Sequence, residues 1–500
     1  MIYSSTRSNN EPRTASYVIM NGIAPDGGLY IPNEIPKLEK ADVLALSEMS
    51  YHERAAKILS MFLTDYTYEE LLTAATDSYS EERFKGGAAP ISKLGESGKY
   101  MLELWHGPTS AFKDMALQIM PRLLSMAIEK SGTDKEALIL VATSGDTGKA
   151  ALEGYADVDR VRISVFYPSD GVSNIQKMQM VTQKGKNVCV SGVKGNFDHC
   201  QTAVKQVFSN EEIRNKIAEE NLFFSSANSI NWGRLAPQIV YYVSSYCDLL
   251  KEKEITYGEE VNVCVPTGNF GNILAAYIAK LMGIPFAKLI CASNSNKILY
   301  DFFETGVYDR RREFYTTISP SMDILISSNL ERLLSMVAGN ENCEKWMKEL
   351  FENGIFTVPD EVRKTLSKDF KGFFADEAQT QNTIKRYFDE FGYLIDPHTA
   401  VALHATDTYM SETGDTKKTI VVSTASPYKF SGAVLEALGY EIPADDFEAL
   451  ERLQSISGTN IPENLYSLKS AEKRFNAVIE KEEIPDKVLE FSKNKDCGLN

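Results

Sequence analysis

The chain has 500 residues, of which 43% are hydrophobic and 24% are charged, so we expect a soluble globular protein with two or three domains. Its formal net charge of -16 argues against nucleic-acid binding and means that any anionic substrate must be held by local positive groups. No apolar run is long enough to span a bilayer, and the first ten residues lack the apolar core of a secretory signal, which favours a cytoplasmic location.

Cysteine and histidine are sparse and scattered along the sequence. The seven cysteines, at positions 189, 200, 247, 264, 291, 343 and 497, include no CxxC pair, and the five histidines form no HExxH motif. This distribution is typical of reduced core thiols in a cytosolic protein. We therefore expect neither disulfides nor a metal site.

Residues 1–85 are interpreted as a small N-terminal domain. The glycine-containing turn at 26–28 leads into a short strand that ends at Pro32. Apolar residues then recur at helical spacing over 43–59 and 68–79. We expect this domain to pack against the rest of the chain without carrying chemistry of its own.

One lysine occupies an unusual position. Residues 99–104 alternate as a short strand does, and Gly107 and Pro108 mark a loop. Helical spacing begins at Asp114 and continues to 130, with a kink expected at Pro121. Lys113 thus precedes a helix, where the positive helix end and burial would lower its pKa and give the neutral amine that forms Schiff bases. The alternative is an ordinary solvated lysine in a first helical turn.

From about residue 90 onward, apolar strands alternate with polar loops and helices. The clearest strands are 137–142, 261–266 and 419–423, and further strands are expected at 161–167, 187–192 and 286–293. This alternation predicts an α/β fold with parallel sheets covered on both faces, in which ligands bind beyond the carboxyl ends of the strands. The last sixty residues are rich in charge, and we expect helices on the surface there.

Two of the loops suit anions. Residues 268–272 (GNFGN) open a helix, and their glycines let backbone N–H groups approach a phosphate. Residues 143–149 (TSGDTGK) offer hydroxyl and N–H groups to a carboxylate or a phosphate. The second loop is not a nucleotide P-loop, because only two residues separate its glycines and Ala150 follows Lys149. Asp146 in this loop is equally suited to capping the helix.

The combination of these features suggests pyridoxal phosphate as cofactor. Its aldehyde would react with Lys113, while its phosphate would occupy the loop at 268–272. Thr424, at the tip of a late strand, would either hydrogen-bond a ring nitrogen or simply cap the strand.

The sequence also resembles the threonine synthases, which are fold-type-II pyridoxal-phosphate enzymes. The similarity extends over nearly the whole length in ordered blocks, among them HGPTSAFKD, TSGDTGKAA, PTGNFGN and STASPYKF. The blocks lie at residues 5–7, 24–32, 106–114, 143–151, 173–180, 195–201, 227–242, 266–272, 319–332, 396–400 and 423–430.

The resemblance implies an architecture and a reaction. A family-specific domain would occupy 1–85, and a cofactor-binding core would occupy 86–440, with a smaller α/β domain inserted at about 115–230. A helical segment would follow at 441–500. The activity implied is a lyase reaction, the last step of threonine biosynthesis, which converts O-phospho-L-homoserine and water into L-threonine and phosphate. The partner is then a small molecule, with no nucleic acid, membrane or metal involved.

The resemblance also assigns residues to roles. Lys113 would carry the cofactor as a Schiff base and move protons. The loop from Ser144 to Thr147, at the start of a helix, would hold the substrate carboxylate. The substrate phosphate would need cations, for which Lys149 and Arg234 are the first candidates. In sequence order, the cofactor site would comprise Lys113, Gly268, Asn269, Phe270, Gly271, Asn272 and Thr424, and the substrate site Ser144, Asp146, Thr147, Lys149 and Arg234, with Arg7 and Lys429 as weaker candidates.

The chain departs from the family pattern in three places. Ser426 and Tyr428 replace a histidine and a small residue in the block STASPYKF, which puts any role for that histidine in doubt. Two further departures, at 173–175 and 198–200, are compatible with neutral loop variation. Two alternative functions stay open: a related phospho-lyase that releases a keto acid, and a non-catalytic paralogue. We interpret His106 and His398 as hydrogen-bonded structural histidines.

Overall fold

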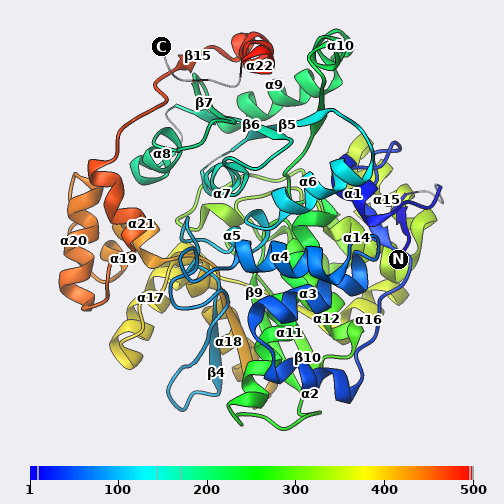
Figure 1. Cartoon of the computed structure of the whole chain (residues 1–500). Coiled ribbons are helices and arrows are strands. Elements are labelled where there is room, and N and C mark those ends of the chain that lie inside the picture. The colour runs from blue at the N-terminus through cyan, green and yellow to red at the C-terminus, as the bar shows by residue number, and fades with distance from the viewer. Residues whose placement is uncertain (8–10, 144, 170–171, 495–496, 498–500) are drawn as a thin grey trace.

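The computed structural model describes residues 1–7, 11–143, 145–169, 172–494 and 497, and two largely parallel sheets organise them (Figure 1). The six-stranded sheet has the order β13-β10-β9-β14-β4-β3, in which β3 alone runs antiparallel to its neighbour among the described strands. Its strands are β3 (Ile91–Lys93), β4 (Lys99–Glu103), β9 (Val261–Pro266), β10 (Phe286–Ser293), β13 (Phe370–Phe374) and β14 (Thr419–Ser423).

The second sheet has five parallel strands in the order β15-β7-β6-β5-β8. They are β5 (Glu136–Ala142), β6 (Val161–Pro168), β7 (Val188–Val193), β8 (Leu222–Ser225) and β15 (Val478–Ile479). The predicted α/β fold with parallel sheets is confirmed. The long apolar runs of β5, β6 and β9 explain this agreement, because strands covered on both faces are apolar throughout.

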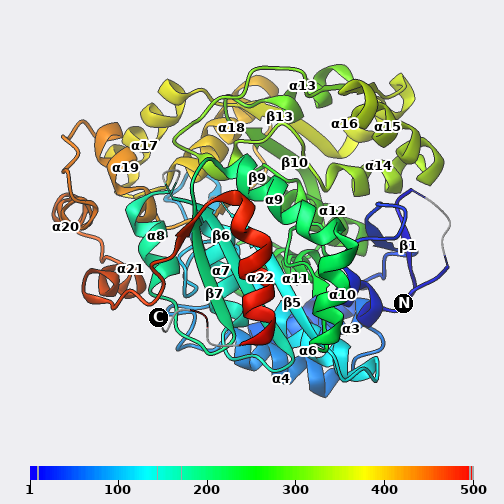
Figure 2. The same ribbon diagram turned by 90° about the horizontal axis from the view of Figure 1, so that it is seen from above.

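Alternate residues of β5 enter two different hydrophobic clusters. Leu138 and Leu140 pack with residues of α9 (Phe197–Ser209) and α22 (Ile484–Lys493), whereas Ile139 and Val141 join the main core on the other face. This follows from the two-residue period of a strand. Figure 2 shows α9, α10 (Glu211–Glu219) and α22 side by side on one face of this sheet. The last sixty residues are therefore not purely helical, because β15 also adds an edge strand beside β7.

Helices α12 (Gly271–Met282) and α18 (Pro397–Thr413) pack against β9 and β10 of the six-stranded sheet. The long α11 (Trp232–Lys251) contacts α12 and the N-terminal helices. The other elements of this half and of the C-terminal region are α13 (Ile298–Thr305), β11 (Val307–Asp309), η1 (Pro320–Met322), α14 (Leu330–Ala338), α15 (Asn340–Asn353), β12 (Ile355–Thr357), α16 (Asp360–Asp369), α17 (Glu377–Phe391), η2 (Pro427–Phe430), α19 (Ser431–Ala437), α20 (Asp446–Ser457), α21 (Glu463–Tyr466), η3 (Ser467–Ser470) and η4 (Lys481–Glu483).

The N-terminal region forms a small antiparallel ribbon and four helices, of which α1 packs on α6 (Met120–Lys130), α2 and α3 pack on α11, and α4 packs on α3. The helix predicted over 43–59 is interrupted at Ser50, whose hydroxyl accepts a hydrogen bond from the backbone N–H of Glu53 and so begins a new helix. The elements are β1 (Tyr3–Ser5), α1 (Ala15–Asn21), β2 (Tyr30–Pro32), α2 (Lys40–Glu48), α3 (Tyr51–Phe62) and α4 (Tyr68–Ser78).

Two further expectations need correction. The helix predicted from Asp114 to residue 130 is two helices, α5 (Asp114–Leu117) and α6 (Met120–Lys130), and Pro121 lies in the first turn of α6, where it needs no N–H partner. A disulfide joins Cys189 and Cys497, so the expectation that all cysteines are reduced is wrong for this pair. The other five cysteines are free and buried. No helix in the described part of the chain is long and apolar enough to cross a membrane.

Candidate active site

Lys113 lies immediately before α5 and close to α7 (Asp146–Tyr155), which follows a strand of the five-stranded sheet. Its Nζ donates a hydrogen bond to Ser321 Oγ at 3.2 Å and lies 3.5 Å from Asp146 Oδ2. Burial lowers the pKa of Lys113, and the positive charges of Lys429 and Arg234 lower it further, while Asp146 opposes the shift. The helix dipole contributes less than the sequence suggested, because α5 has only four residues.

The loop before Lys113 is held by a buried carboxylate. Asp114 accepts hydrogen bonds at 2.8 Å from both the backbone N–H and the hydroxyl of Thr109. A Cβ on Gly107 would lie 2.6 Å from Asp114 Oδ2, so only glycine fits there. Burial raises the pKa of Asp114 to about 6. The backbone N–H of Phe112 donates to the carbonyl of Thr424 at 2.8 Å, which brings the end of β14 next to Lys113.

Residues 268–272, here called the glycine loop, connect β9 to α12. Phe270 adopts a left-handed conformation with φ of 64°, which turns the chain into the helix. A Cβ on Gly268 would lie 2.7 Å from the backbone oxygen of Ser321, so the absence of a side chain allows this close approach. The segment after η1 also holds the loop, because the backbone N–H of Asn329 donates to the carbonyl of Asn269 at 3.0 Å.

Asn272, in the first turn of α12, is oriented by two tyrosines. The hydroxyls of Tyr241 and Tyr242 donate to its Oδ1 at 2.5 and 2.6 Å. Its buried Nδ2 has no hydrogen-bond partner among the described residues. A buried donor at the start of a helix needs an acceptor, and a phosphate group satisfies this need. The glycine loop therefore fits the phosphate of the predicted cofactor.

Asp146, at the start of α7, forms ion pairs with Lys113 and Lys429. Its Oδ1 lies 2.5 Å from Lys429 Nζ and accepts a hydrogen bond from Gln176 Nε2 at 3.0 Å. Burial alone would raise the pKa of Asp146, but the charges of Lys429 and Lys113 hold it well below its usual value. The fully buried Lys429 also donates to the carbonyl of Thr109 at 3.0 Å.

The two predicted phosphate-binding cations differ in their surroundings. Arg234 is 4% exposed and donates from Nη1 to the carbonyl of Ala227 at 2.6 Å. Its Nε has no partner among the described residues, and no described carboxylate forms an ion pair with it. Burial lowers its pKa to about 10. Lys149, by contrast, lies 3.0 Å from Glu153 Oε2 and donates to Gln183 Oε1 at 2.5 Å.

The remaining predicted residues are less informative. Thr147 is half-buried in the first turn of α7. Ser144 lies outside the described residues. Arg7, a weaker candidate for the substrate phosphate, donates to both carboxylate oxygens of Glu331 at 2.8 and 2.9 Å.

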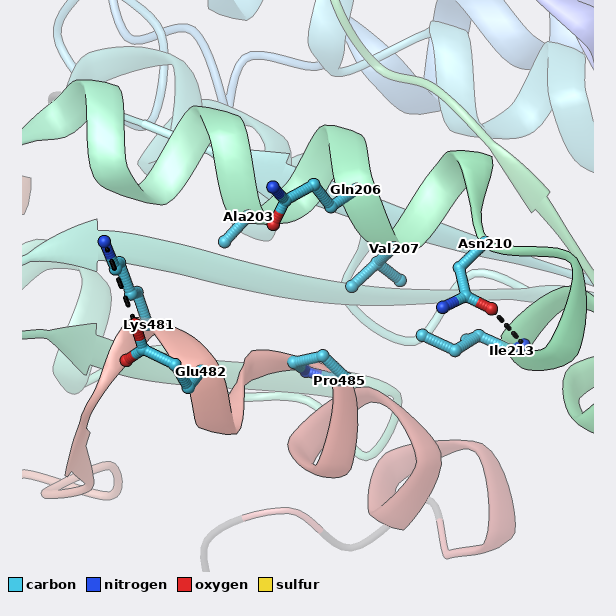
Figure 3. A pocket seen from close by; sticks show the side chains of 8 residues that line it. All are labelled: Ala203, Gln206, Val207, Asn210, Ile213, Lys481, Glu482 and Pro485. Carbon is cyan, nitrogen blue, oxygen red and sulfur yellow. Dashed lines mark hydrogen bonds and ion pairs between the residues drawn. The ribbon is translucent and has the colours of Figure 1, made fainter.

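A shallow pocket lies elsewhere, between α9 and the C-terminal segment (Figure 3). The only ion pair among its lining residues joins the neighbouring residues Lys481 and Glu482, and none of the predicted site residues contributes to it. It is lined by Ala203, Gln206, Val207, Asn210, Ile213, Lys481, Glu482 and Pro485.

Comparison with known families identifies the chain. The family model "Threonine synthase N terminus" matches residues 2–79, "Pyridoxal-phosphate dependent enzyme" matches 91–425, and "Threonine synthase, C-terminal" matches 399–488. The chain belongs to the threonine synthase family. The predicted family, its pyridoxal-phosphate cofactor and the fold-type-II architecture are thereby confirmed.

Individual members of the threonine synthase family are similar over different shares of their length. "Threonine synthase-like 1" from Macaca fascicularis is 41% identical over 85% of this chain, which spans only 58% of that relative. "Threonine synthase" from Saccharomyces cerevisiae is 36% identical over 87% of this chain and 89% of its own length. The crystal structure of a PLP-bound threonine synthase from Brucella melitensis is 33% identical, covers 99% of this chain and 100% of its own, and superposes with a TM-score of 0.87.

The sequence pattern indicates no role for Ser321 or Gln176 and predicts His398 only as a hydrogen-bonded structural histidine. Ser321 contacts the amine of Lys113, Gln176 contacts Asp146, and His398 accepts a hydrogen bond from the backbone of Ser321. All three lie in blocks shared with the threonine synthase family, which was the only signal available for them. The weaker candidate Lys429 proves to be a central member of the cluster.

Proposed function

We propose that the protein is a threonine synthase that converts O-phospho-L-homoserine and water into L-threonine and phosphate. The observation that carries this proposal is the buried cluster in which Asp146 pairs with Lys429, while Arg234, close enough to lower the pKa of Lys113, has no described carboxylate partner and remains a positive charge in excess. Buried cations in excess need anions, and a phosphorylated substrate supplies them. Membership of the threonine synthase family supports the same reaction.

Pyridoxal phosphate, when bound, supplies an electron sink for the removal of protons next to its attachment point. We infer that the N–H groups of the glycine loop and Asn272 Nδ2 bind its phosphate. Lys113 would hold its aldehyde, and the hydroxyl of Thr424 would serve its ring nitrogen. The backbone N–H of Phe112 donates to the carbonyl of Thr424 and so joins the loop of Lys113 to the end of β14. This contact supports the proposal that Lys113 and Thr424 serve the same cofactor ring.

Lys113 is also the proposed proton carrier. Burial and the neighbouring cations lower the pKa of its amine, so a larger fraction is neutral and able to accept a proton near pH 7. We infer that Lys113 removes protons from Cα and then Cβ of the substrate before the phosphate leaves. Lys113 would then return one proton to Cγ and one to Cα, while water supplies the hydroxyl at Cβ and its remaining proton neutralises charge on the released phosphate.

Arg234 is the preferred ligand for the substrate phosphate. It is a buried guanidinium without a carboxylate partner among the described residues, and its free Nε can donate to an anion. Lys149 remains a proposed second ligand, but it would have to share its charge with Glu153.

The substrate carboxylate is assigned to the start of α7. The backbone N–H groups of its first turn, including that of Thr147, suit an anion at the positive helix end. Asp146 is negatively charged and paired with Lys429, so it assists by holding this cation beside the site and does not contact the carboxylate itself. Ser144 keeps its proposed role on the basis of the sequence alone.

A phospho-lyase reaction remains the second candidate, because the family and its cofactor do not fix the fate of the substrate after its phosphate has left. The test is to incubate the cofactor-loaded protein with O-phospho-L-homoserine and identify the products. A synthase gives threonine and phosphate in equal amounts. A keto acid with ammonia would identify a phospho-lyase, and no phosphate release would contradict both activities. Lys113→Ala is the inactive control.

A further inference from the structure

His398 is a buried member of a series of hydrogen-bonded polar groups that reaches the amine of Lys113. It is the second residue of α18, and Asp396 caps this helix. Asp396 Oδ1 lies 2.9 Å from the backbone N of His398 and 2.8 Å from its Nδ1. On the other side of the ring, Nε2 lies 3.1 Å from the backbone N of Ser321. The exposed fractions are 0% for Asp396 and 3% for His398.

These contacts fix the tautomer of His398. A backbone N–H group can only donate, so Nε2 must present its lone pair to Ser321. The ring proton therefore sits on Nδ1 and is donated to Asp396. The ring also packs against Phe430, with 5.0 Å between the ring centroids, so its orientation is set by packing as well as by hydrogen bonds.

Ser321 connects this histidine to the reactive amine. Its backbone N–H is held by His398, and its hydroxyl accepts the hydrogen bond from Lys113 Nζ at 3.2 Å. Its backbone oxygen faces Gly268, where a Cβ would approach to 2.7 Å. Ser321 thus contacts the amine and the glycine loop from one short turn, η1, which lies more than 200 residues from Lys113 in sequence.

We propose that His398 is a positioning residue which, held by Asp396, fixes Ser321 so that the serine hydroxyl orients the amine of Lys113. The histidine acts only through Ser321, and its role is independent of the substrate that the enzyme uses. The proposal predicts that loss of the histidine acceptor and loss of the serine hydroxyl have the same effect on the amine. It also predicts that the two losses are not additive.

The experiment uses the full-length protein without cofactor and follows its amine directly. The rate at which trinitrobenzenesulfonate modifies Lys113, located by peptide mapping, is measured against pH. The hydroxyl of Ser321 accepts a hydrogen bond from the ammonium form, so Ser321→Ala should move the midpoint of this curve to lower pH by about one unit. Equilibrium binding of deoxypyridoxine phosphate, which lacks the aldehyde, should stay within about twofold because the glycine loop keeps its shape.

Three substitutions at His398 complete the test. Gln keeps an acceptor near the position of Nε2 and should leave the midpoint as in the wild type, whereas Leu removes the acceptor and should lower the midpoint as Ser321→Ala does. Asn is polar but too short to reach Ser321, so it should also lower the midpoint. If the Leu variant does not fold, the Asn variant takes its place in the test. The double variant of His398 and Ser321 should shift no further than either single variant.

Two results would overturn the proposal. One is an unchanged midpoint in Ser321→Ala or in the folded acceptor-less variant of His398. The other is a double variant whose shift is the sum of the two single shifts, because independent effects add and effects transmitted through one serine do not. Neither result bears on whether the protein makes threonine, so failure here is separate from failure of the proposed function.

Discussion

The amine of Lys113 lies 3.5 Å from Asp146 Oδ2, although the two residues belong to different halves of the molecule. Lys113 follows β4 of the six-stranded sheet, and Asp146 follows β5 of the five-stranded sheet. Figure 1 shows α5 and α7, which begin beside these residues, between the two sheets. The candidate active site is thus assembled from loops that follow strands of both sheets, where α/β proteins commonly bind ligands.

The glycine loop provides a matched pair of variants. Gly268→Ala would bring a Cβ within 2.7 Å of the backbone oxygen of Ser321, whereas on Gly271 the nearest atom to a Cβ would be the side-chain Nδ2 of Asn329, at 3.3 Å. Backbone cannot move as cheaply as a side-chain end, and overpacking of this kind costs about 1–3 kcal/mol. We expect Gly268→Ala to weaken cofactor binding by about tenfold or more and Gly271→Ala to weaken it less. Equal affinities by equilibrium dialysis would contradict this view of the loop.

The variant Arg234→Met tests whether Arg234 contributes to substrate binding and not to the stability of the fold. Replacing a buried cation that lacks a carboxylate partner by an apolar side chain is neutral or stabilising, so Tm should not fall. If Arg234 binds the substrate phosphate, kcat/KM should fall by about ten- to a hundredfold. Lys149→Met should have a smaller effect on kcat/KM because Lys149 already pairs with Glu153. The assignment fails if kcat/KM survives in Arg234→Met, and the order of the two cations is wrong if Lys149→Met loses more.

Asp114 should make stability depend on pH. Because burial raises its pKa from 3.8 to about 6, the folded protein holds this proton more tightly than the unfolded chain does. Its contribution to stability is therefore present below about pH 4 and is lost as the pH rises through about 6. The free energy of unfolding of the wild type relative to Asp114→Asn should fall by about 3 kcal/mol across this range.

Urea unfolding of the cofactor-free proteins between pH 4.5 and 7.5 measures about 2 kcal/mol of this change, because the rest occurs at lower pH. Asp198→Asn, at an exposed position, serves as the control and should show no such trend. A difference between wild type and Asp114→Asn that stays constant or grows with pH would show that Asp114 titrates normally.

Much of the fold could be predicted from the sequence, because its strands are long apolar runs bounded by glycine and polar loops. The predicted strands at 261–266, 286–293 and 419–423 have the bounds observed for β9, β10 and β14. The helices were harder to delimit, since apolar spacing continued through Ser50, where a side-chain cap begins a new helix. The pairing of β15 with β7 joins residues almost 300 positions apart, and local pattern carries no information about it.

The candidate site, like the fold, could be predicted from the sequence only in part. Lys113 and the glycine loop have local signatures, a loop before a helix and a glycine-rich turn. The contacts of Ser321 and His398 depend on segments brought together by the sheets, so the sequence could not predict them. It also could not rank Arg234 above Lys149, because the partner of Lys149 became visible only in the structure.

Attachment of the cofactor can be mapped directly. Borohydride reduction of the loaded protein followed by peptide mapping should find the pyridoxyl group on Lys113, because burial and nearby cations favour its neutral amine. Lys429 is the informative internal control, since its amine lies even closer to Asp146, at 2.5 Å against 3.5 Å for Lys113, but is fully buried and hydrogen-bonded to Thr109. A pyridoxyl group on Lys429 would reverse the assignment.

The reaction itself is tested most directly by isotope labelling. The loaded enzyme is incubated with O-phospho-L-homoserine in water enriched in ¹⁸O, and both products are examined by mass spectrometry. Because the proposed reaction breaks the carbon–oxygen bond at Cγ and adds water at Cβ, the label should enter the hydroxyl of threonine and be absent from the released phosphate. Label in the phosphate, with homoserine as the other product, would mean simple phosphate-ester hydrolysis and would contradict the proposed function.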